Sequence, residues 1–164
     1  MRKLYLLIVL LTFQNIFCQV ESAEIILNYN FSAGEENLEI NLNRNSDSTK
    51  VTIDSKKILE YFYSKKQERK VIETVNRNFY ISNEVFDDLL KQIKAISKSG
   101  LNKNTIVIDN GKITTITVKN DKMNIYYEVI ALNMENSEGE LKKFLNVCVK
   151  ILDIGNFKPE NYFD

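Results

Sequence analysis

Few residues of this chain could do chemistry, and histidine is not among them. The 164 residues contain no His and two Cys, so Ser-His and Cys-His nucleophile systems are excluded, as are zinc cages built from Cys and His. The five glycines are separated from one another along the chain, and no Gly-rich loop for a phosphate is present. We therefore expect no catalytic residue, no metal site and no cofactor, and we expect the protein not to be an enzyme.

Carboxylates are the remaining candidates for acid/base chemistry. Glu84, Asp87 and Asp88 fall at the start of an expected helix, where a negative charge is stabilised by about 0.3–1 kcal/mol. Asp109 directly precedes Asn110-Gly111 and is expected in a turn. These local roles account for the four acids, so no catalytic pair is predicted from them.

The first 18 residues are typical of a secretory signal peptide. Arg2 and Lys3 precede an uncharged apolar run over 4–13, which is too short to cross a bilayer core that needs about 20 apolar residues. Cleavage is expected after Cys18 or, alternatively, after Ser22. The chain is thus expected to be an exported bacterial protein, periplasmic or secreted, with no transmembrane helix after cleavage. Attachment of a lipid to Cys18 is the alternative, although the preceding residues do not resemble a lipobox.

Removal of residues 1–18 leaves 20 basic against 22 acidic residues, a net charge of −2. This near-neutral charge provides no general attraction to nucleic acid. Cys148 is then the remaining cysteine, which excludes an intrachain disulfide. Residues 19–164 have a suitable length for a single domain, and 155–164 are expected to form its C-terminal tail.

The first half of this domain has the alternating pattern of β-strands. Leu38, Ile40 and Leu42 alternate with polar residues, which indicates a sheet with one buried face and one solvated face. Further strands are predicted over 25–31, 50–53, 56–64 and 71–75, the last continued at 79–81 after a polar interruption. For 56–64 a helix is the alternative, because Ile58, Leu59 and Phe62 also fit helical spacing. A hairpin loop is expected over 64–69.

Two later segments have helical spacing. The stretch 83–97 has an apolar stripe, with Ser82 placed to cap its first turn and Gly100 after its end. The stretch 138–153 follows Ser137, which together with Glu140 has the spacing of a capping box. Cys148 falls on the apolar stripe of this second helix, so a buried thiol is expected.

Strands are also predicted between these helices, over 105–109, 112–119 and 123–133. Asn110-Gly111 separates the first two, and such a dipeptide between β-branched runs predicts a hairpin. The predicted fold class is α+β: an antiparallel sheet of hairpins and a meander, with two amphipathic helices packed on one face.

Aromatic and basic residues gather around the hairpin loop expected over 64–69, and further aromatic residues lie in the tail. Aromatic residues are enriched at binding hot spots, and the combination with cations suits an interaction patch. The candidate patch consists of Tyr61, Tyr63, Lys65, Lys66, Arg69, Phe157, Tyr162 and Phe163. For the three tail aromatics, packing against the sheet is the first expectation, and membership of the patch is the alternative.

Three classes of function are compatible with these observations. We expect a non-catalytic exported module that binds another exported or envelope protein, as an inhibitor or immunity protein does. A carrier of a small ligand or lipid in the cell envelope is the alternative, and it would need an apolar pocket. An enzyme that uses carboxylates is the third class, and it would need titratable groups converging in a cleft.

Overall fold

The computed structural model describes residues 22–31, 36–64, 67–101, 112–135 and 137–163; within 58–71 it describes the backbone alone. It has the predicted α+β class, with an open six-stranded antiparallel sheet and several helices. The strands are β1 (Ala23–Asn30), β2 (Glu36–Arg44), β3 (Thr49–Ser64), β4 (Gln67–Ile81), β5 (Ile113–Asn120) and β6 (Met123–Ile130). Their order in the sheet is β4-β3-β2-β1-β5-β6, so the first strand of the chain lies near the centre.

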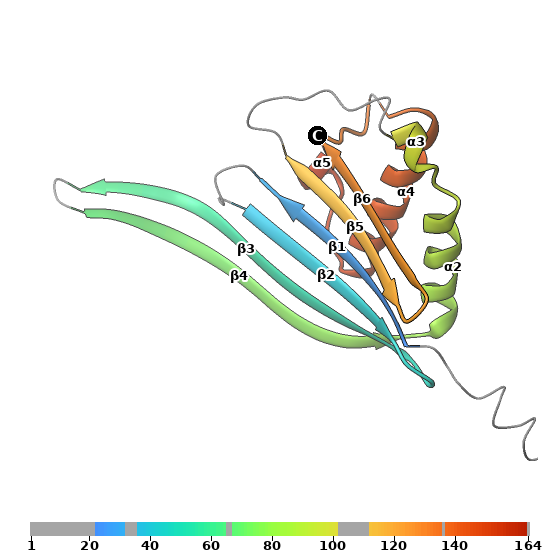
Figure 1. Ribbon diagram of the computed structural model, residues 1–164. Helices are drawn as coiled ribbons and strands as arrows, with labels where there is room; N and C mark the ends of the chain where they lie inside the picture. Colours follow the sequence, from blue (N-terminus) through green and yellow to red (C-terminus); the bar gives the residue numbers. More distant parts are fainter. Residues whose placement is uncertain (1–21, 32–35, 65–66, 102–111, 136, 164) are drawn as a thin grey trace, which may run out of the picture.

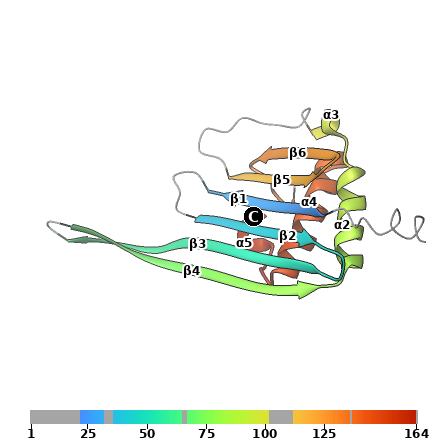
Figure 2. The same ribbon diagram turned by 60° about the horizontal axis from the view of Figure 1, so that its bottom comes forward.

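Alternation along the strands produces the buried face that the sequence predicts. Leu38, Ile40 and Leu42 of β2 are buried, and Ile25 of β1 lies directly opposite Leu42. Phe86 and Phe144, from two later helical segments, belong to the same core cluster as these strand residues. Tyr127 of β6 donates a hydrogen bond from its hydroxyl to the carbonyl of Ile96, which lies between two helices (2.8 Å). Figures 1 and 2 show the helical layer behind the central strands.

The β3–β4 hairpin is much longer than the sequence suggested. The expected loop over 64–69 is wrong in extent, because β3 continues to Ser64 and β4 begins at Gln67. The expected polar interruption before 79–81 is absent, since β4 is continuous to Ile81. Polar residues are tolerated there because successive side chains of a strand point to opposite faces.

The first helix, α2 (Asn83–Lys94), presents its predicted apolar stripe to the core through Phe86, Leu89 and Ile93. It ends before the expected residue 97, and α3 (Lys98–Leu101) follows. Ser82 occupies the N-cap position but makes no side-chain capping hydrogen bond. The expected capping interaction is therefore not formed.

The second long helix, α4 (Gly139–Ile154), covers the range predicted for it. The expected capping box is not formed, because the N-cap residue is Glu138 and Ser137 donates its hydroxyl to the Asn133 carbonyl. At the end of α4, a Cβ on Gly155 would lie 2.8 Å from Phe157 and 3.0 Å from Ile40. A glycine is required there because helix and sheet approach so closely.

Strands β5 and β6 confirm the second part of the predicted meander. The segment 105–111, with its predicted strand and Asn-Gly turn, lies outside the described residues. Strand β5 has β1 on one side and β6 on the other.

Candidate interaction surface

A two-stranded arm carries the first half of the patch that the sequence indicates. Strand β2 accompanies β3 as far as Lys57, which lies opposite Glu36. Beyond that point the described pairings of β3 are with β4 alone, and they continue to Ser64 opposite Gln67. This arm, defined by the described residues 58–64 and 67–72, projects away from the sheet and the helices (Figure 1).

The arm brings the predicted aromatic and basic residues into register with one another. Tyr61 lies opposite Lys70, Tyr63 opposite Glu68, and Phe62 opposite Arg69. Lys65 and Lys66 fall between the two strands and lie outside the described residues. The register shifts between Ile58 and Glu60, so a β-bulge marks the place where the arm leaves the sheet.

The second half of the predicted patch lies in the core. Tyr162 and Phe163 belong to α5 (Glu160–Phe163) and are 5% and 1% exposed. Both meet Tyr29 edge-to-face, with ring centroids 5.0 and 6.4 Å apart, and Phe157 meets Tyr162 at 5.9 Å. The tail therefore packs against the sheet, as expected, and Tyr162 and Phe163 do not extend the exposed patch.

Burial has the expected electrostatic effect on this aromatic cluster. It raises the pKa of Tyr162 to about 12, with the charges of Glu36 and Glu73 adding to the effect. The pKa of Tyr29 is also raised, first by burial and then by Glu36. Both phenols thus stay neutral at physiological pH, in keeping with core residues.

Arg77 of β4 joins this cluster and was not singled out from the sequence. Its guanidinium lies 5.3 Å from the centroid of Phe157, and Nη2 donates to the Gly155 carbonyl at 2.6 Å. Its Nε is buried without a hydrogen-bond partner. An inward-facing cation on an outer strand is visible in the alternation of β4 only once the register of the sheet is known.

The opposite face of the sheet is open and polar. Glu24 of β1 lies between Asn43 and Lys119 in the register of the neighbouring strands, and its carboxylate accepts a hydrogen bond from Asn41 (2.6 Å). Two tyrosines stand out on the outer strands of this face: Tyr80 is 66% exposed and Tyr126 is 47% exposed.

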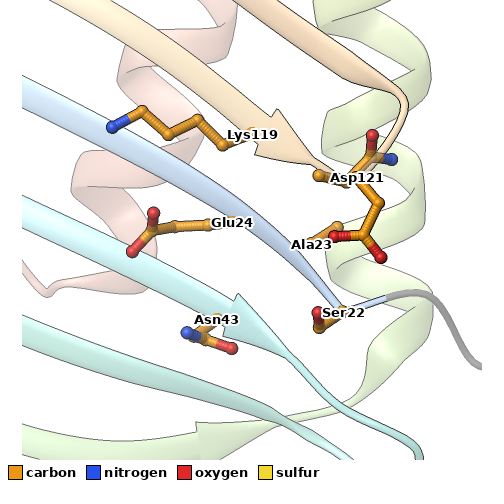
Figure 3. A pocket seen from close by; sticks show the side chains of 7 residues that line it. Ser22, Ala23, Glu24, Asn43, Lys119 and Asp121 are labelled. Carbon is orange, nitrogen blue, oxygen red and sulfur yellow. The ribbon is translucent and has the colours of Figure 1, made fainter.

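A shallow cleft of about 290 Å³ lies at the beginning of β1. Glu24, Asn43 and Lys119 extend over the open face, while Ser22 and Asp121 lie at its lower end (Figure 3). The lining combines a cation with two carboxylates and amides, and it lacks the apolar walls of a typical ligand pocket. No sequence motif marks this cleft.

The carboxylates considered for catalysis go to different partners. Asp87 binds Arg44, with 3.0 Å between Oδ1 and Nε. Asp88 receives the Lys150 ammonium at 3.2 Å and the Gln92 amide at 2.6 Å. The lysine and Asp88 border a smaller cleft, of about 190 Å³, between α2 and α4.

The thiol, possible metal ligands and possible membrane helices complete the description of the candidate sites. Cys148 is fully buried, and burial raises the pKa of its thiol; this is the buried thiol that the sequence predicts. Within the described ranges no cluster of three Cys, Asp or Glu could hold a metal ion. No helix in the described part of the chain is long and apolar enough to cross a membrane.

Comparison of the chain with family models, with curated proteins and with solved structures found no match.

Proposed function

We propose that this protein is an exported, non-catalytic interaction module that binds another exported or envelope protein through its β3–β4 arm. The observation that supports this proposal is the arm itself, a ribbon in which β3 and β4 pair beyond the end of β2. Residues 58–64 of β3 span about 23 Å at roughly 3.3 Å per residue. An inhibitor or immunity protein could use such a projection to enter a groove of its partner.

The energetics of two-stranded ribbons also support a binding role. An isolated hairpin is at best marginally stable in water, because it has no core to bury its side chains. The described residues of the arm, 58–64 and 67–72, therefore contribute little to the stability of the body. A partner that covers Tyr61, Tyr63 and their basic neighbours would supply the missing contacts, since aromatic residues with cations are enriched at binding hot spots.

The carrier and the carboxylate enzyme remain less favoured. The two clefts described above are open hollows on the surface, bordered by charged residues. A carrier would need an apolar cavity, and an acid/base enzyme would need carboxylates that converge in one cleft.

Deleting the arm tests the proposal. Lys57 and Glu73 lie opposite each other, so residues 58–72 can be replaced by an Asn-Gly turn that closes the shortened hairpin. We expect the variant to keep the melting temperature of the parent within about 4 °C. We expect it to lose a partner that co-purifies stoichiometrically with the parent from the envelope or medium of the native host.

Tyr126→Ala is the matched control, because Tyr126 lies on β6 at the far edge of the sheet. The control should retain the partner. A deletion variant that still recovers the partner would overturn the assignment to the arm. Recovery of the parent chain without any stoichiometric protein would overturn the interaction module itself.

A further inference from the structure

The outer edge of β4 offers a second binding surface, distinct from the tip of the arm. Strand β4 is the last of the sheet and has 15 residues, and among the described strands β3 alone pairs with it. In Figures 1 and 2 no helix runs along this edge. A long free edge presents a row of unpaired backbone donors and acceptors, which is a template for another strand.

Exposed apolar and aromatic side chains of β4 also favour the binding of another strand. Ile72 is 46% exposed and Tyr80 is 66% exposed, one near each end of the described part of the strand. Strand β4 contains no proline and is not short, so two of the devices that protect an edge are absent. Charged side chains are a third such device, and β4 carries Glu73 and Arg77, so a strand that binds here has to pair with these charges. The opposite edge strand, β6, has eight residues, so it offers about half this length.

The charges of β4 indicate what fits there. When the strand is placed antiparallel to a second copy of itself about Val75, Glu73 lies opposite Arg77 of the second copy, and the reverse pair forms by symmetry. Opposite charges directly across an antiparallel pair stabilise it. Centring the pair on Glu73 instead would place Glu73 against itself and Arg69 against Arg77, which is repulsive.

Arg77 has N–H donors available for the Glu73 carboxylate of the second copy. A guanidinium has five N–H donors, and the described contacts of Arg77 use Nη2 for the Gly155 carbonyl and leave Nε without a partner. The packing of the guanidinium on Phe157 fixes its position near the edge. A carboxylate from a neighbouring strand would provide a counter-ion for this guanidinium.

The same register also covers part of the arm. Pairing about Val75 places residues 69–72 of one copy against 78–81 of the other. The two-stranded arm thereby gains a third strand from the body of the second copy, which relieves the marginal stability of an isolated hairpin. In this arrangement Val71 falls opposite Phe79 in the register.

We propose that the edge of β4 binds a second copy of this chain, antiparallel about Val75, and that the two sheets join into one. The dimer leaves the β3 side and the tip of each arm free. The inference is therefore compatible with partner binding through the arm but does not depend on it.

Cysteine cross-linking of the full chain tests both the dimer and its register. In Val75→Cys the two cysteines face each other across the symmetry axis, at a Cα separation of about 4.5–5.5 Å, which suits a disulfide. In the control Asn78→Cys the two cysteines lie about 20 Å apart along the strands and cannot join. Buried Cys148 is inaccessible in both.

We expect mild oxidation of purified protein to yield a covalent dimer from Val75→Cys and none from Asn78→Cys. Reversing the charge in Glu73→Arg should weaken the dimer by roughly tenfold in sedimentation equilibrium, because two attractive pairs become repulsive. Glu73→Gln should weaken it less, since it removes the attraction without adding repulsion.

A monomer at every accessible concentration would overturn the proposal, and so would cross-linking of Asn78→Cys in preference to Val75→Cys. These measurements use the purified chain alone, so their result is separate from that of the arm deletion. A monomer that still loses its partner when the arm is deleted would refute the dimer alone. A dimer that recovers no partner would refute the interaction module alone.

Discussion

Asn83, the first residue of α2, ties the helix to the sheet. Its Oδ1 accepts a hydrogen bond from the buried Thr49 hydroxyl (2.8 Å), and its Nδ2 donates to the carbonyls of Asn45 (3.0 Å) and Ser46. The β2–β3 turn that it contacts is itself ordered by Asn45, whose Oδ1 accepts from the backbone of Ser48. One amide thus joins a helix start, a strand and a turn.

Replacing this amide should cost more than replacing the nominal N-cap residue. Asn83→Ala leaves the Thr49 hydroxyl buried without its partner, so we expect a loss of about 1–3 kcal/mol in the free energy of unfolding. Ser82→Ala is the control, since Ser82 makes no capping bond, and we expect a change below about 0.5 kcal/mol. Urea unfolding of both variants measures the difference, and equal losses would contradict the assignment.

Residues that point into the core were predictable because burial follows the alternation of apolar residues in strands and their spacing of three or four in helices. Leu38, Ile40, Leu42 and Cys148 occupy the buried positions that the sequence indicates. The absence of side-chain capping by Ser82 and Ser137 was not predictable, because a serine hydroxyl can bond to any of several nearby backbone groups. Their choice depends on neighbouring elements rather than on spacing.

Among the elements, α4 binds the segment between α2 and α3 through the carboxylate of Glu140. Glu140 accepts a hydrogen bond from the Ser97 backbone N–H (2.6 Å) and an ion pair from Lys143 (2.6 Å). These two interactions, the lysine first, lower the pKa of Glu140 below its usual 4.5. Gly100 lies beside this side chain, where an added Cβ would collide with it.

A lowered pKa makes the contribution of Glu140 depend on pH in a defined direction. The folded state favours the charged form, so the stabilisation is complete above pH 4.5 and is lost as the pH falls below it. We therefore expect Glu140→Gln to be less stable than the parent at pH 7. The difference should shrink on acidification, as measured by thermal unfolding at a series of pH values, and a constant difference would contradict this role.

The existence of most elements was predictable, whereas their extent and partners were not. The apolar stripes of α2 and α4 depend on local periodicity, which the sequence contains in full. The length of β4 and the placement of β1 beside β5 depend on pairing between distant segments. The arm combines both cases: its hairpin was predicted, but its projection follows from where β2 ends.

At the scale of the whole molecule, backbone protection should fall from the centre of the sheet towards the arm. Strand β1 pairs on both sides and carries Ile25 and Leu27, which are fully buried. The arm is paired on one side of each strand. We expect native-state hydrogen exchange to be slowest in β1 and fastest in residues 58–64, because exchange from the arm needs only local opening.

Dimerisation would modify this gradient in a recognisable way. Amides of β4 that face outward should become protected as the protein concentration rises, while those of 58–64 should not. Mass spectrometry of peptides from the two strands can distinguish them. Equal protection of β4 and the β3 side of the arm would contradict the gradient.

The arm and the helical layer share a mechanical connection. Strand β4 runs without interruption from the arm to Ile81, and Ser82 alone separates it from α2. A sideways force on the arm is therefore transmitted along β4 to the start of α2. The contacts of Asn83 with Thr49 and of Asp87 with Arg44 hold that end of the helix, so they would be the first to resist when a bound partner pulls on the arm.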